Sequence, residues 1–153
     1  MSIAASAFSA EWIRPKPVKL YATYCSAKKD TATGLVPARE RYISDRITGV
    51  EKRAQLTDAR FAILSGKFGL IPPDTPIADY DHLLQRTQLT EMTNTVAHTL
   101  EAWGVTQVHW FSVAFEMDPN VHLYKTVMAD AAATKGIDFE LEIWEPTGTL
   151  GLI

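Results

Sequence analysis

The sequence predicts an α/β domain with a mostly parallel sheet of about four to five strands and helices on both faces, in a Rossmann-like, three-layer arrangement. Apolar patterns typical of strands alternate along the chain with patterns typical of helices, which indicates repeated helical crossovers between parallel strands. The size fits one such domain, because 153 residues with 46% hydrophobic and 22% charged residues can bury a substantial core.

Four segments are predicted as strands. Residues 18–24 alternate between apolar and polar side chains, and residues 61–64 form a short apolar run, as expected of a strand buried on both faces. Residues 107–115 form the third strand. Residues 138–144 alternate apolar and acidic side chains, so this strand is expected at a sheet edge with one face in water.

Three segments between these strands are predicted as helices. Residues 45–56 have Ser44 or Asp45 as N-cap, although Gly49 lowers the helical propensity. Apolar residues at helical spacing begin at residue 89 and end before Gly104, and a second amphipathic pattern over residues 121–135 ends at Gly136. Residues 71–87 contain three prolines and are predicted as a long surface loop.

The chain divides into an N-terminal arm (1–17), one α/β domain (18–146) and a C-terminal tail (147–153). The arm ends in a proline-rich segment, and the tail is apolar. Self-association of the arm and the tail, giving a homodimer, is one hypothesis for these segments. Disorder, which is common at chain ends, is the alternative.

The cysteine content and the N-terminus indicate a cytoplasmic protein without membrane association. Cys25 is the only cysteine, which excludes an intramolecular disulfide and is typical of a reducing compartment. No cationic segment followed by an apolar run begins the chain, and no stretch approaches the ~20 apolar residues that cross a bilayer.

Charge is distributed unevenly along the chain. Residues 1–67 hold 12 of the 15 Lys and Arg and 6 acidic residues, a net charge of +6. Residues 68–153 hold the other 3 and 12 acidic residues, a net charge of −9. This asymmetry fits a site for an anionic ligand. It fits equally well a fold in which basic and acidic faces pair with each other.

The loops that leave the strands are the candidate site, because ligands of parallel sheets bind beyond the carboxyl ends of the strands. After the first strand, Ser26 and Lys28 offer donors suited to phosphate or carboxylate. After the second, Ser65 and Lys67 occupy a turn with two glycines and are expected to point into the cleft. For each loop, an ordinary turn with exposed lysines is the alternative.

Further candidates lie in segments that could fold over this edge. Arg39 or Arg41 could bind an anion through two parallel hydrogen bonds. Asp81 could act as a general base, and Glu116 follows the third strand where a catalytic carboxylate would sit. A solvated surface is the alternative for each. The four histidines lack the spacing of a zinc site, and the sequence indicates no metal and no cofactor.

Several segments together resemble a family found in bacteria and phages that is distantly related to the peroxide-stress YaaA proteins. The family's pattern is a Cys-Ser-x-x-Lys loop, a small-residue-plus-Tyr segment, a Leu-Ser-Ala/Gly-x-x-Gly-Leu turn and a Tyr-Asp pair. Here these are Cys25–Lys29, Pro37–Tyr42, Leu64–Leu70 and Tyr80-Asp81, and the resemblance covers residues 18–84. The first loop also resembles the Pro-Cys-Ser-x-x-Lys-Pro-Tyr motif of archaeosine synthase, which modifies a deazaguanine base in transfer RNA, although Lys29-Asp30 replace Pro-Tyr.

The resemblance implies eight site positions, most of which the strand ends had already indicated: Ser26, Lys28, Arg39, Tyr42, Ser65, Lys67, Tyr80 and Asp81. We expect an enzyme, a transferase or hydrolase, acting on a nucleotide, a nucleobase or a modified base in nucleic acid. Ser26, Lys28, Arg39 and Lys67 would hold phosphate. Tyr42 or Tyr80 would stack on or orient the base. The candidate catalytic residues are Ser65, Asp81 and Glu116.

The alternative function is a non-catalytic, YaaA-like stress protein that binds nucleic acid. The sequence pI of about 5.8 argues against it, because nucleic-acid binders usually carry a basic surface. For the enzyme, the partner is a nucleotide or another small anionic ligand. We further expect five residues to converge on one pocket: Ser26, Lys28, Ser65, Lys67 and Asp81.

Overall fold

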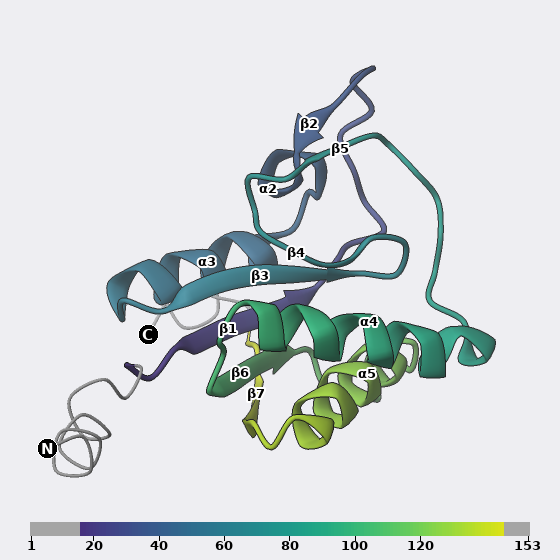
Figure 1. Cartoon of the computed structure of the whole chain (residues 1–153). Coiled ribbons are helices and arrows are strands. Elements are labelled where there is room, and N and C mark those ends of the chain that lie inside the picture. The colour runs from purple at the N-terminus through teal and green to yellow at the C-terminus, as the bar shows by residue number, and fades with distance from the viewer. Residues whose placement is uncertain (1–15, 146–153) are drawn as a thin grey trace, which may run out of the picture.

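A mixed, mostly parallel five-stranded sheet with helices packed against it makes this an α/β protein (Figure 1). The structure is a computed structural model, and it describes residues 16–145. The tail and most of the arm lie outside the described residues. The hypothesis that these segments form a homodimer concerns them and is therefore outside the described part of the chain as well. Among the described helices, none combines the length and the apolar character needed to cross a membrane.

The sheet has the strand order β4-β3-β1-β6-β7. The strands are β1 (Lys19–Tyr24), β3 (Arg60–Ser65), β4 (Gly69–Ile71), β6 (Gln107–Ser112) and β7 (Asp138–Ile143). All neighbours pair in parallel except β3 and β4, which are antiparallel. The four predicted strands are therefore confirmed, with the acidic strand β7 at an edge.

Two details of the sheet differ from the sequence prediction. The third strand ends at Ser112, three residues before the predicted end. The chain also turns back after β3, so that Ser65 faces Gly69 across an antiparallel pair. Gly69 has φ of 77°, a left-handed conformation that glycine adopts without steric cost. The three-residue strand β4 was too short to be recognised from a periodic pattern.

The three predicted helices are confirmed as α3 (Asp45–Leu56), α4 (Leu89–Ala102) and α5 (Val121–Thr134). Ser44 caps α3, because its Oγ accepts a hydrogen bond from the backbone N–H of Ile47 at 3.2 Å. Val50 and Ala54 of α3 pack against Tyr21 and Phe111. Side chains that alternate with these two along β1 and β6 join α4 and α5 in the larger core cluster.

The order of the strands reverses beside β1. Along the chain, β1 is followed first by β3 on one side and then by β6 on the other. With right-handed crossovers, this reversal directs α3 to one face of the sheet and α4 and α5 to the other. Figure 1 shows α3 on a different side of the strands from α4 and α5. The loops that leave β1 and β6 therefore separate at this edge, which is where ligands bind in such sheets.

A small lobe lies apart from the sheet (Figure 1). It consists of β2 (Val36–Pro37), the single-turn helix α2 (Ala38–Arg41) and β5 (Pro76–Ile77), with β2 and β5 antiparallel. The predicted surface loop 71–87 thus contains β5, and also the 3₁₀ turn η1 (Arg86–Gln88). It is only partly a surface segment, because Ile77 and Leu84 are buried.

Arg41 holds the lobe together from its interior. Its side chain is fully buried, and its guanidinium donates to the carbonyl oxygens of Asp30, Ala32, Gly34 and Ile77 at 2.7–3.3 Å. The suggestion that Arg41 binds an anionic ligand is therefore wrong. A guanidinium that donates to four carbonyls fastens the loop 30–34 to β5 instead.

Candidate functional site

A pocket of about 650 Å³ lies where β1 and β6 end, at the reversal of strand order. We call it the β1–β6 pocket. Its walls come from the loops after both strands and from the first turns of α3 and α5. They include Cys25, Ser26, Arg46, Asp118, Asn120 and Tyr124. A second hollow of about 480 Å³, the turn pocket, lies beside the turn after β3 and includes Lys67, Phe68, Gln88 and Glu91.

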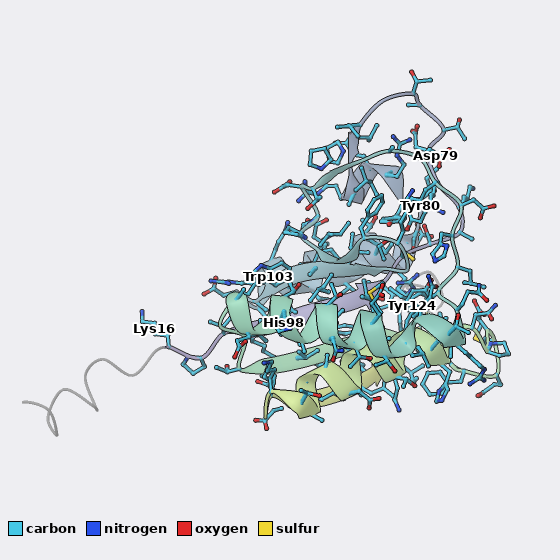
Figure 2. The ribbon with its side chains drawn as sticks, turned by 45° about the vertical axis from the view of Figure 1, so that its right-hand side comes forward. Lys16, Asp79, Tyr80, His98, Trp103 and Tyr124 are labelled. Atoms are coloured by element: carbon cyan, nitrogen blue, oxygen red, sulfur yellow. The ribbon has the colours of Figure 1, made fainter. Side chains whose placement is uncertain are left out.

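The segment Asp81-His82 lines both pockets. It belongs to the chain that crosses the carboxyl edge of the sheet between β5 and η1, and this crossing divides the space there into two. Figure 2 shows Tyr80, next to this segment, and Tyr124 toward one side of the molecule, with Lys16 and Trp103 toward the other. The five residues expected in one pocket therefore do not share one: Ser26 and Asp81 line the β1–β6 pocket, Lys67 and Asp81 line the turn pocket, and Lys28 and Ser65 line neither.

The loop after β1 starts as a continuation of the sheet and then turns. The backbone N–H of Cys25 donates to the carbonyl of Leu64 at 2.9 Å, and the Ser26 hydroxyl donates to the carbonyl of Lys28 at 2.7 Å. The turn leaves Lys28 exposed and outside the lining of both pockets. Lys29 lines the β1–β6 pocket instead, and its Nζ lies 4.5 Å from the centre of the Tyr80 ring.

Arg46, in the first turn of α3, supplies the buried cation of the β1–β6 pocket. Its guanidinium donates to the carbonyls of Tyr24 at 2.7 Å and Cys25 at 3.2 Å and to the hydroxyl of Thr23. It also lies 3.6 Å from the centre of the Tyr24 ring. Burial lowers the pKa of Arg46, because the charged form loses solvation. The sequence analysis did not identify this residue.

Buried hydroxyl groups connect the turn after β3 to the small lobe. Ser65 Oγ accepts the backbone N–H groups of Lys67 at 3.1 Å and Phe68 at 3.0 Å, so its own proton is left for the Tyr80 hydroxyl at 2.9 Å. The Tyr80 and Tyr42 hydroxyls are 2.5 Å apart. Burial raises the pKa of Tyr42 to about 12 and raises that of Tyr80 as well, so both stay protonated at neutral pH.

This chain of hydroxyls changes the roles expected for three residues. Ser65 is fully buried and anchors the turn through backbone groups, and it lines neither pocket. Tyr42 is 3% exposed, so its ring has no open face for a base to stack on. Tyr80 is half-buried, with Phe68 edge-on at 5.1 Å and Lys29 over its ring.

Cys25 and Tyr124 form part of the floor of the β1–β6 pocket. The thiol donates to the Tyr124 hydroxyl oxygen at 3.8 Å, and that oxygen also accepts the backbone N–H of Leu84 at 3.1 Å. Burial raises the pKa of Tyr124. Gly66 fits closely against the same hydroxyl, since a Cβ at this position would lie 2.8 Å from it. The hydroxyl of Tyr124 therefore ties α5 to the crossing segment and to Cys25 after β1, and the turn after β3 packs closely against it.

Two predicted site residues, Arg39 and Glu116, line neither pocket. Arg39 pairs with Glu51 of α3 at 2.7 Å and with Asp74, and hydrogen bonding to Glu51 raises its pKa further. Its guanidinium fastens the lobe to α3, and Arg39 lines neither pocket. Glu116 is exposed and lines neither pocket, because β6 ends early and places Asp118 at the pocket instead.

The structure thus places Ser26 and Asp81 in the β1–β6 pocket and Lys67 and Asp81 in the turn pocket. Sequence reasoning missed Arg46, Tyr124 and His82. For Arg46 the sequence does hold a signal, because it is a cation in the first turn of a helix capped by Ser44. Such a cation is unfavourable beside the helix dipole unless something else holds it. Within residues 16–145, no three His, Cys, Asp or Glu side chains are grouped as a metal site.

Comparisons with protein-family models, curated proteins and solved structures give no match to this chain. The resemblance to the YaaA-related family therefore rests on the motifs within residues 18–84 alone.

Proposed function

We propose that the protein is an enzyme, a transferase or hydrolase, that acts on a nucleotide, a nucleobase or a modified base in nucleic acid, bound in the β1–β6 pocket. In this proposal the fold is a Rossmann-like, three-layer α/β fold, the protein is cytoplasmic, and the family is the one related to YaaA. The observation that carries it is the position of a pocket lined by chemically active side chains at the reversal of strand order.

The size and lining of the pocket support a single small ligand with an apolar and a polar part. A volume of about 650 Å³ lies within the roughly 300–1,000 Å³ typical of small-molecule sites. Leu83 and Met117 line it although they are 45% and 72% exposed. They offer apolar contact to a planar base. Ser26, Asn120 and Arg46 offer polar contacts.

Groups suited to proton transfer border the same pocket. Asp81 and His82 form the wall shared with the turn pocket, and Asp118 stands on the opposite loop, after β6. A carboxylate and an imidazole are common general acids and bases. We assign proton transfer to Asp81, as the sequence suggested, with His82 and Asp118 as the neighbouring titratable groups.

The test of this proposal is a calorimetric binding panel of nucleoside phosphates, nucleosides, nucleobases and short single-stranded oligonucleotides. We expect at least one of the first three classes to bind the wild-type protein. Asn120→Trp should abolish that binding, because the indole would fill the pocket while the native Asn120 side chain makes no capping hydrogen bond. Gln55→Trp, on the exposed end of α3, is the matched control and should bind normally.

Two results would count against the enzyme proposal. Unchanged binding by Asn120→Trp would place the ligand elsewhere. Binding of oligonucleotides alone, with an affinity that falls steeply with salt, would instead support the nucleic-acid-binding alternative.

A further inference from the structure

We propose that Arg46 holds a phosphate monoester in the β1–β6 pocket, so that the ligand is a nucleoside monophosphate rather than a free nucleoside or base. This inference rests on the proposed function, because it takes the β1–β6 pocket to be the substrate site. It assigns the anion to a buried arginine at the end of β1, and no longer to Lys28 and Lys67.

The hydrogen bonds of Arg46 leave part of its guanidinium available. A guanidinium has five N–H donors. Nη1 donates to Thr23 and Tyr24, and Nη2 donates to Cys25, which accounts for three of them. Within the described part of the chain, Nε has no acceptor and Nη2 has one donor left. Side by side, Nε–H and Nη2–H match two oxygens of a phosphate.

The charge of Arg46 also lacks a direct counterion. No carboxylate of residues 16–145 lies within 4 Å of it, whereas Arg39 and Arg53 both have carboxylate partners. Asp118, which lines the same pocket, attracts Arg46 only from beyond that distance. Arg46 is only 8% exposed, and a buried charge is costly unless it is paired. The carbonyls of Tyr24 and Cys25 offset only part of that cost. An anion in the pocket would supply the missing partner.

Neutral donors that line the pocket together with Arg46 favour an acceptor-rich anion such as phosphate. Ser44 Oγ accepts the backbone N–H of Ile47, so its own proton remains free to be donated. The Asn120 side chain has no hydrogen-bond partner among the described residues. Both residues line the pocket with Arg46. The carboxylates of Asp81 and Asp118 line it too, and they would repel a phosphate from their sides of the pocket.

The test is isothermal titration of the full chain with nucleoside 5′-monophosphates, the corresponding nucleosides and inorganic phosphate. We expect the monophosphate to bind about tenfold or more tightly than its nucleoside, because charge-assisted hydrogen bonds to Arg46 are added. Inorganic phosphate alone should compete with the monophosphate. Arg46→Lys keeps the charge but loses the paired donors, so it should lose most of this preference.

Two variants that alter charge without touching Arg46 keep the test decisive if Arg46→Lys does not fold. Asn120→Asp should lower the preference for the monophosphate over the nucleoside several-fold, and Asp118→Asn should raise that preference, because the added or removed charge acts on the phosphate alone. Asp130→Asn makes the same charge change elsewhere on α5 and should have no effect.

The outcomes separate this inference from the proposed function. If nucleosides and monophosphates bind equally, and Asn120→Asp and Asp118→Asn behave like wild type, the phosphate site is wrong and the proposed function stands. If no nucleoside, nucleobase or nucleoside phosphate binds, and inorganic phosphate does not bind either, both fail. Binding of inorganic phosphate that is insensitive to Asn120→Asp would also overturn the assignment to Arg46.

Discussion

Replacement of Arg41 by methionine is expected to destabilise the protein by about 3–5 kcal/mol, the largest effect of any substitution considered. Four backbone carbonyls lose a charged donor, at roughly 1.5–3 kcal/mol for each such hydrogen bond, and those that become exposed regain bonds to water. Urea denaturation measures the free energy of unfolding. Limited proteolysis should at the same time show new cleavage within residues 30–34, because this loop loses its attachment to β5.

Two further variants identify the cause. Arg41→Lys should recover little of the lost stability, because an ammonium has three donors and cannot span the same carbonyls. Arg60→Met is the control. Arg60 is exposed, and among residues 16–145 its side chain makes one hydrogen bond, to the Trp103 carbonyl at 3.1 Å, so its loss should cost about 0.5 kcal/mol or less. Wild-type stability of Arg41→Met would show that the lobe does not depend on this side chain.

Replacement of Gly66 by alanine is expected to destabilise the protein by about 1–3 kcal/mol, through overpacking. The new Cβ would lie 2.8 Å from the Tyr124 hydroxyl and 2.9 Å from the Leu84 backbone nitrogen. The hydroxyl and that nitrogen are hydrogen-bonded to each other, so the turn after β3 and the crossing segment cannot both keep their positions. Urea denaturation again gives the size of the effect.

A double variant tests whether the contact of the new Cβ with the Tyr124 hydroxyl causes the loss of stability. Tyr124→Phe removes the crowded hydroxyl, so Gly66→Ala should cost less in the Tyr124→Phe background than in wild type. Equal costs in both backgrounds would show that the strain lies elsewhere in the turn.

Most of the fold could be predicted from local patterns. The helices α3, α4 and α5 and the strands β1, β3, β6 and β7 each have a periodic apolar pattern, and Ser44, Gly104 and Gly136 mark helix ends. The short strands β2, β4 and β5 have only two or three residues, too few for a period to be visible. Their pairing depends on contacts between segments far apart in sequence, such as Val36 with Ile77.

The site was predicted less well than the fold. The direction of each side chain depends on hydrogen bonds within the loops and on neighbouring helices, which a sequence pattern does not reveal. The rule that ligands bind beyond the carboxyl ends of parallel strands pointed to Ser26 and Lys67, and each lines a pocket at that edge. Asp81, expected from a segment folding over the edge, lines both pockets. It named Lys28 in place of Lys29, since the hydrogen bond from Ser26 to the Lys28 carbonyl closes a turn that no pattern reveals. Arg46 was missed because it belongs to a helix, and side chains in a first turn reach back past the helix start.

The measurement that tests the central claim most directly uses the methionine methyl groups as reporters. Met117 lines the β1–β6 pocket, Met92 lines the turn pocket and Met128 is buried in the core. With methyl-labelled methionine, titration of a nucleoside monophosphate should shift the Met117 signal and leave those of Met92 and Met128 in place. A shift of Met92 without Met117, or no shift of either at saturating ligand, would contradict a substrate site between β1 and β6.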